Sequence, residues 1–239
     1  MSSFFKRFSS IVLMGILSSG VWAAGNKIAA DPGAYVPLGT DTIVRNGYTL
    51  IFINQDKTFD PQVKHKMVHT FFQVYPALAR QFNPATLKTV TFVMDTTYNG
   101  VAGAANGQVS YSPEWLRKHP GDIDVVTHEV MHIVQNYPGD AGPGWITEGI
   151  ADYVRYKFGL DNASAGWALP EYQHGHSYTN SYRITARFLA WIEQKVKPGF
   201  VTSLDASMRT KKYAAATWQQ LTGKTMDELW KAYSANPAL

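Results

Sequence analysis

The sequence predicts an α+β fold: a small N-terminal sheet packed on a helix with the motif H-E-x-x-H, then a mainly helical C-terminal part. Two patterns support this. The three segments that read as strands all precede the motif, namely Tyr48 to Asn54, Leu87 to Asp95 and the short Gln108 to Ser112. From the motif onward, apolar residues recur at helical spacing.

The first residues have the pattern of an export signal. Lys6 and Arg7 precede an apolar stretch over residues 11–17, and Val21-Trp22-Ala23 fits a cleavage site. We therefore expect a signal peptide over residues 1–23 and a single domain over residues 24–239. We expect a secreted or periplasmic protein with no membrane association after signal removal. The chain has no cysteine, so it must rely on an ordinary apolar core.

Charge gives little information about a partner. Removing Lys6 and Arg7 lowers the formal charge from +4 to about +2, and the remaining basic residues are scattered. There is no basic run with interleaved aromatic residues of the kind that binds nucleic acid. We expect no nucleic-acid partner and a monomer.

Turn signals and caps organise the N-terminal half. Asp31-Pro32-Gly33 and Pro37-Leu38-Gly39 predict irregular chain from Gly25 to Val44. Asp60-Pro61 should begin a helix, since Asp is a favoured N-cap and Pro a favoured first residue. Farther on, Asn99 to Gly107 is expected to be a glycine-rich loop. It lacks the lysine and following helix of a phosphate-binding loop.

The helix after Asp60 has a histidine pair of its own. His65 and His69 are four residues apart, but they lie off the apolar stripe and beside Lys64 and Lys66. These lysines would repel a cation, so a solvated face is favoured over a second metal site.

The motif itself is His128, Glu129 and His132, and the segment Asp122-Ile-Asp before it is expected to supply an acidic N-cap. Residues four apart on a helix lie on the same face, so the two histidines can bind one ion with Glu129 beside it. This is the zincin arrangement, in which the glutamate is the general base for a metal-bound water. The alternative is a buried structural histidine pair.

The segments after the motif read as further helices. Trp145 to Phe158 has helical apolar spacing, and Glu148 and Asp152 share one of its faces. The cluster His174-Gly-His176 reads as part of an exposed loop, with a third ligand or a substrate contact as the alternative. Additional helices are expected at Ser181 to Glu193, Phe200 to Met208 and Thr225 to Tyr233, the last with a capping box.

The chain resembles the basic secretory protein family, peptidases of plants and bacteria. The resemblance is carried by FNPATLKTVTFVMD, NGVAGAANGQVSYSPEWLRKHPGDIDVVTHEVMHIVQ, GWITEGIADYVRY, SYRITARFLAWIE and LTGKTMDELWKAY. It covers most of the chain from about Asp60 to Tyr233. It implies a zincin-like metallopeptidase fold, with a role in defence or in the breakdown of external protein.

A more distant resemblance is to thermolysin-like peptidases, whose E-x-x-x-D segment supplies the third ligand and a brace for the first histidine. By this resemblance Glu148 is the third zinc ligand and Asp152 accepts a hydrogen bond from His128, although the gap after the motif is shorter here. Zincins also pair an edge strand with extended substrate, and Gln108 to Ser112 stands in that place.

The expected chemistry is hydrolysis of a peptide or protein substrate with Zn2+ as cofactor and Glu129 as base. The donor to the carbonyl oxygen is open among Tyr182, Tyr178, His174 and His176; Tyr182 is favoured, and Tyr178 begins a Y-T-N-S segment similar to thermolysin's H-x-N-S. One alternative is a catalytically weak or inactive scaffold that serves in binding or defence. The other, a glycan or ester hydrolase, has no second carboxylate pair to support it.

Overall fold

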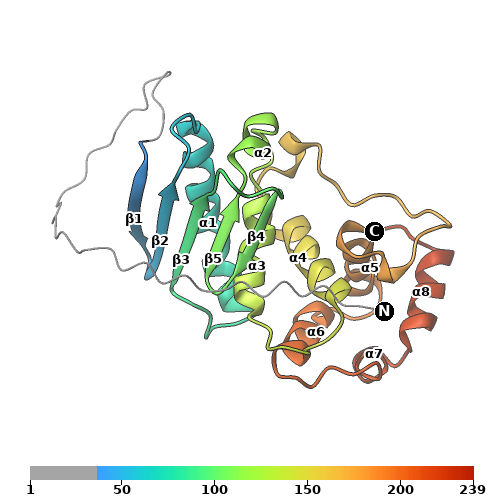
Figure 1. Cartoon of the computed structure of the whole chain (residues 1–239). Coiled ribbons are helices and arrows are strands. Elements are labelled where there is room, and N and C mark those ends of the chain that lie inside the picture. The colour runs from blue at the N-terminus through green and yellow to red at the C-terminus, as the bar shows by residue number, and fades with distance from the viewer. Residues whose placement is uncertain (1–36) are drawn as a thin grey trace. The chain divides into compact units, whose positions relative to one another are not determined.

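The computed structural model describes residues 37–239, so the expected signal peptide lies outside the described residues. The described chain has an α+β fold in which a five-stranded sheet precedes most of the helices (Figure 1). Within residues 37–239, no helix combines the length and the apolar character needed to cross a bilayer.

The sheet has the strand order β1-β2-β3-β5-β4. Strands β2, β3 and β5 run parallel to one another, while the outer strands β1 and β4 are each antiparallel to their neighbour. The bounds are β1 Gly39–Arg45, β2 Tyr48–Asn54, β3 Thr89–Met94, β4 Ala102–Ala105 and β5 Gln108–Tyr111. The three strands expected from the sequence are β2, β3 and β5.

Both outer strands correct the expectations. Strand β1 occupies part of the segment to Val44 that was expected to be irregular, and β4 lies inside the expected loop from Asn99 to Gly107. Each is joined to its partner by an Asn-Gly pair with positive φ at both residues: Asn46-Gly47 at 50° and 79°, and Asn106-Gly107 at 52° and 79°. Such pairs favour the two-residue turns that match the twist of a hairpin. They were the missed signal for both strands.

The position of β5 is a further correction. The segment Gln108 to Ser112 was expected at the edge of the sheet, but β5 lies between β3 and β4. The turn at Asn106-Gly107 folds the glycine-rich segment back as one more strand. The edge strand next to β5 is therefore β4, with the sequence AGAA.

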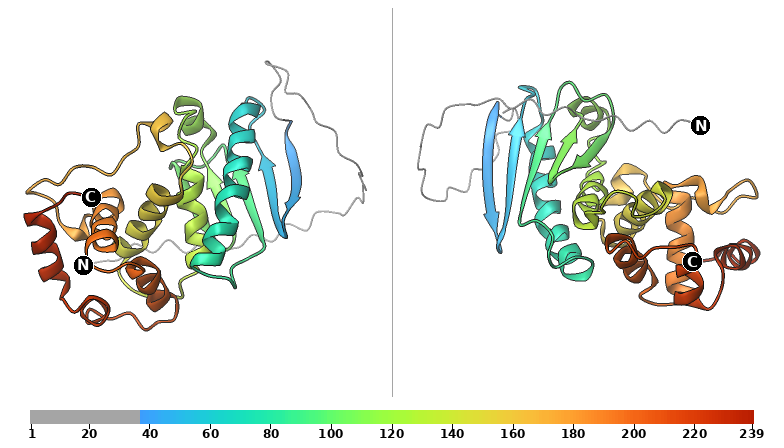
Figure 2. Two further views of the ribbon diagram at one scale, coloured as in Figure 1. Left: turned by 180° about the vertical axis from the view of Figure 1, so that it is seen from behind. Right: turned by 60° about the horizontal axis from the view of Figure 1, so that its bottom comes forward.

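Two helices line one face of the sheet. Helix α1 (Pro61–Gln81) contacts β2 and α3, and α3 (Val125–Gln135) contacts β4 and β5, as the rear view in Figure 2 shows. Helix α1 begins as expected, with the Asp60 carboxylate accepting a hydrogen bond from the Gln62 backbone at 2.7 Å. Aromatic side chains fill the core between the layers, including Phe52, Phe71, Phe92 and Tyr111.

The end of α3 is tied to the chain that follows α1. The Asn83 side chain donates to the Val134 carbonyl at 2.8 Å, and the Thr86 hydroxyl donates to the Ile133 carbonyl at 3.2 Å. Carbonyls in the last turn of a helix lack partners within the helix, so these buried bonds satisfy them. They also fix the end of α3 to the segment that leads into β3.

Helices α4 to α8 form a second layer around an aromatic cluster of Tyr178, Phe188, Trp218, Trp230 and Tyr233. Helix α5 contacts α4, α6 and α8. The elements are α2 Pro113–Lys118, α4 Gly144–Phe158, η1 Asn162–Ala165, η2 Tyr178–Asn180, α5 Tyr182–Lys195, α6 Phe200–Arg209, α7 Thr217–Thr222 and α8 Met226–Ala235. The expected capping box of α8 is present at Thr225 and Glu228, whereas the short α7 was not expected.

Candidate active site

Helix α3 carries the motif in a buried position. Asp124, within the segment expected to supply the N-cap, precedes the helix. Its side chain makes no capping hydrogen bond, and its carboxylate instead accepts hydrogen bonds from the Leu160 and Asp161 backbones. His128 is 8% exposed and Glu129 is 6% exposed. The Nε2 atoms of His128 and His132 lie 3.1 Å apart, one helical turn along the same face.

The chain then reverses and brings a third donor to these nitrogens. Helix α3 ends at Asn136, whose φ of 40° is left-handed, and α4 returns against α3. The Oε2 atom of Glu148, on α4, lies 3.2 Å from Nε2 of His128 and 3.5 Å from Nε2 of His132. The group His128, His132 and Glu148 could therefore hold a metal ion.

The donor spacing fits a tetrahedral ion. Nitrogen and oxygen ligands bind Zn2+ at about 2.0–2.2 Å, which places neighbouring donors roughly 3.3–3.5 Å apart. The three separations here are 3.1, 3.2 and 3.5 Å. Three protein donors leave a fourth position for water or substrate, as in catalytic sites.

Hydrogen bonds to the other ring nitrogens set the tautomers. Nδ1 of His128 donates to Oδ1 of Asp152 at 2.7 Å, because a carboxylate can only accept. Nδ1 of His132 lies 2.7 Å from Oε1 of Gln135, whose amide nitrogen donates to the Thr147 carbonyl at 3.0 Å. Both Nδ1 atoms therefore carry protons, so Nε2 of each ring is the nitrogen that binds an ion once it is deprotonated.

Gln135 was missed in the sequence. It is 1% exposed and three residues after His132, so it lies on the same face of α3. A glutamine buried on the ligand face was the available signal. Asp152 takes the position that the resemblance implied, against His128.

The two candidate tyrosines lie in different surroundings. The Tyr182 ring is nearly parallel to that of His128, with 6.2 Å between centroids, and the residue is 54% exposed. The Tyr178 hydroxyl donates to Asp227 on α8 at 2.7 Å, and its ring packs on Trp145. The structure thus places the Tyr182 ring against His128, while the Tyr178 hydroxyl is bonded to α8.

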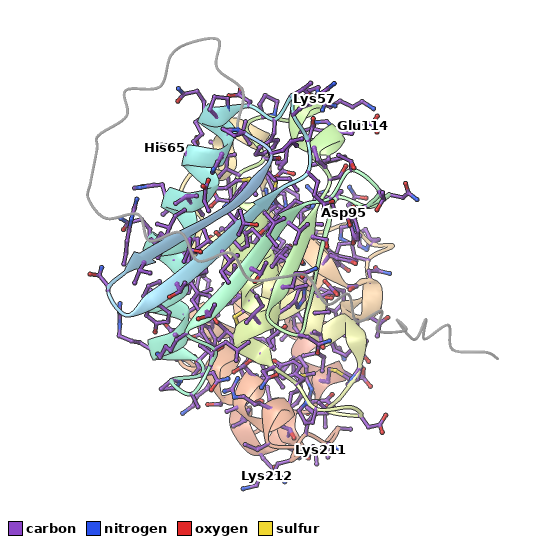
Figure 3. The ribbon with its side chains drawn as sticks, turned by 60° about the vertical axis from the view of Figure 1, so that its left-hand side comes forward. Lys57, His65, Asp95, Glu114, Lys211 and Lys212 are labelled. Carbon is purple, nitrogen blue, oxygen red and sulfur yellow. The ribbon has the colours of Figure 1, made fainter. Side chains whose placement is uncertain are left out.

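The other histidines stand apart from the metal-binding group. His174 and His176 lie in the segment after η1 and contact the ring of Tyr172. His65 projects from the outer side of α1, where Figure 3 labels it, and both it and His69 are exposed. In the described part of the chain, neither pair belongs to a group of three metal-binding side chains.

A comparison with known families identifies the family of this chain. A sequence model of the family described as "Peptidase of plants and bacteria" (BSP) matches residues 48–233. The chain belongs to this family. The match includes every residue of the metal-binding group, and also Gln135 and Asp152.

A solved structure is also similar. It is a two-domain M1 zinc metallopeptidase mutant bound to L-tryptophan, 14% identical, with a TM-score of 0.42. The match covers 84% of the BSP chain and 48% of the other, so the chain spans about half the length of that structure. No curated protein sequence matched the chain.

The charges of the site shift its pKa values in different directions. Burial alone would lower the pKa of His128, but hydrogen bonds to Asp152 and Glu148 raise it to about 10. Burial opposes ionisation of Glu148, yet both histidines hold the pKa of its carboxyl far below the usual range. Burial raises the pKa of Glu129 above its ordinary value, against the pull of the two histidines.

Three substitutions should rank the groups by their contact with the ion. Glu148→Ala should lose most of the affinity for Zn2+, because it removes a donor atom. Asp152→Ala and Gln135→Ala should each cost about 10–100-fold, because they only orient a histidine. Competition titrations with a zinc-binding dye give the affinities. A larger loss from Asp152→Ala than from Glu148→Ala would reverse the assignment of ligand and brace.

Metal binding should release a proton at neutral pH. With a pKa of about 10, the His128 imidazole is protonated without an ion, and an ion can bind only its neutral form. Affinity should therefore rise with pH through the neutral range. Calorimetric titration of Zn2+ in two buffers of different ionisation enthalpy measures the released protons. Equal heats in both buffers would contradict the protonated state of His128.

Proposed function

We propose that this BSP-family protein is a zinc-dependent endopeptidase with a zincin-like fold, secreted or periplasmic, that hydrolyses peptide or protein substrates. The observation that carries the proposal is the convergence of His128, His132 and Glu148 beside Glu129 on the motif helix. Export rests on the basic and apolar pattern before Ala23.

The residues of the site divide into those that would bind or orient the metal ligands and those that take part in the reaction. His128, His132 and Glu148 would hold Zn2+, while Asp152 and Gln135 keep the two imidazoles in the tautomer that binds it. When bound, zinc supplies Lewis acidity, which polarises the scissile carbonyl and lowers the pKa of water from about 15.7 toward roughly 7.

Glu129 moves the proton. It follows His128 directly in α3 and is not part of the metal-binding group. Its carboxylate would take a proton from the attacking water and later give it to the leaving amine. Burial raises its pKa, which makes its carboxylate a stronger base than an exposed glutamate.

Tyr182 is suited to stabilise the carbonyl oxygen as negative charge develops on it. Its pKa is raised chiefly by the negative charge of Glu148, then by burial, Asp152 and Glu129, so the hydroxyl keeps its proton and can donate. Ser181 and Tyr182 have φ values of 69° and 47°. Backbone strain of this kind at two successive residues recurs where a side chain must be placed for function.

The substrate would pair with the edge strand β4. An extended peptide there gains main-chain hydrogen bonds that depend little on its side chains. This replaces the expectation that Gln108 to Ser112 receives the substrate, since β5 is paired on both sides. The same helix α3 that carries the motif contacts β4.

A scaffold that only binds protein, without turnover, is the alternative. Incubating the purified protein with unfolded casein, with and without a chelator, distinguishes the two. Cleavage that stops with chelator and returns with Zn2+ supports the peptidase. Absence of cleavage by the zinc-loaded protein would favour the binding protein.

Changing Glu129 to Gln should abolish hydrolysis and leave zinc content near one ion per chain. The amide keeps the shape of the side chain but cannot take a proton, a loss of about 10²–10⁴ in rate. Casein cleavage and metal analysis of untagged protein measure the two quantities. Loss of the metal together with activity would show instead that Glu129 is needed for the ion.

Replacing Tyr182 with Phe should lower kcat by about 10²–10³, because one hydroxyl donor to the transition state is removed. The ring and the zinc content should be retained. Tyr178→Phe is the matched comparison: it removes the bond to Asp227 and should affect stability more than kcat. If kcat falls by about 10²–10³ in Tyr178→Phe and stays unchanged in Tyr182→Phe, the donor is Tyr178.

A further inference from the structure

The edge strand β4 presents two residues outward. The backbone N–H of Ser112 donates to the Val101 carbonyl at 3.0 Å, so Val101 and Ser112 form a hydrogen-bonded pair. The next pairs in the antiparallel register are Ala102 with Tyr111 and Gly103 with Ser110. In such a ladder, directly opposed pairs alternate between bonded and non-bonded. The backbone groups of Gly103 therefore face β5. Those of Ala102, and by the same alternation Ala104, face away from the sheet.

One of these outward groups is already taken. The hydroxyl of Tyr98 donates to the Ala102 carbonyl at 2.8 Å. Tyr98 belongs to the segment between β3 and β4 that begins at Asp95, labelled in Figure 3. Strand β4 offers two outward carbonyls to an extended peptide, those of Ala102 and Ala104. Tyr98 is bonded to the first and not to the second.

Two glycines let the tyrosine reach the strand. A Cβ atom at Gly103 would lie 2.5 Å from the Tyr98 hydroxyl oxygen, and one at Gly100 would lie 2.8 Å from the ring. Neither glycine has a positive φ, so the backbone itself does not require glycine there. The requirement is room for the ring of Tyr98.

Tyr98 also lies near the reacting groups. Burial first, and then the negative charges of Glu129 and Asp95, raise the pKa of Tyr98. Tyr98 in turn contributes to the raised pKa of Tyr182. A peptide that runs along β4 toward Glu129 would therefore meet this side chain.

We propose that Tyr98 competes with the substrate for the edge strand: its hydroxyl occupies the Ala102 carbonyl and must release it before an extended peptide can pair along the whole of β4. The inference rests on the proposed function, in which β4 receives the substrate. An incoming amide replaces one hydrogen bond with another and gains little there. The protein should consequently tolerate a substrate residue without an N–H at that position.

Peptide binding tests the competition without turnover. The probe is a dye-labelled casein peptide of about ten residues, and its Kd is measured by fluorescence anisotropy in the zinc-loaded Glu129→Gln protein. Adding Tyr98→Phe should tighten binding by about 2- to 10-fold, the range of one net hydrogen bond. A backbone N-methyl scan of the peptide should find one position where methylation cancels this gain.

Gly103→Ala is an independent route to the same state. Its methyl group displaces the far end of the Tyr98 side chain and leaves the strand intact, so it should give a similar gain. The gains of Tyr98→Phe and Gly103→Ala should not add, because both free the same carbonyl. Tyr156→Phe, on an exposed residue of α4, is the matched control and should leave Kd unchanged.

The outcomes separate this inference from the proposed function. Equal or weaker peptide binding in both variants, or no peptide binding at all, would overturn the competition. Tighter binding in the variants, with no casein cleavage by the wild-type protein, would support the competition and refute the peptidase. In peptidase assays of Tyr98→Phe, KM should fall with kcat unchanged.

Discussion

The site depends on the packing of α4 against α3, which two hydrogen bonds between the helices hold in one register. Asp152 accepts from His128, and Gln135 joins His132 to the Thr147 carbonyl of α4. A buried polar group without its partner costs about 1–3 kcal/mol, so a slip of one helix along the other is unfavourable. The same register sets Glu148 beside both Nε2 atoms. The packing that stabilises the helices therefore also preorganises the metal-binding group.

Close approach of α5 to α4 extends this arrangement. Gly149, next to Glu148, has no side chain, and a Cβ there would lie 2.8 Å from Cβ of Thr185 on α5. The two helices can thus pack tightly, and the first residue of α5, Tyr182, reaches the face of His128. Two successive positive φ values, at Ser181 and Tyr182, cost on the order of 1–3 kcal/mol each. Such strain persists only where the surrounding structure holds the residues in place.

Much of the fold could be read from local patterns. Strand β2 and helix α1 were expected nearly at their observed bounds, since an apolar alternation and an N-cap followed by proline are local signals. Strand β1 was missed because it is largely exposed and begins with polar residues, and β4 because it contains only Ala and Gly. Only the Asn-Gly turns indicated them. With β4 unseen, β5 was wrongly placed at the edge of the sheet.

The sequence alone determined that His128 and His132 share a helix face with Glu129 beside them, because a spacing of four residues suffices for that. Only the tertiary structure decided how Glu148 meets them, since the chain between α3 and α4 can close in many ways and packing selects one. Tertiary packing likewise separated Tyr182 from Tyr178, which are close in sequence but directed to different partners. It also placed Tyr98 on β4, through strand pairing and room left by two glycines, which no local pattern encodes.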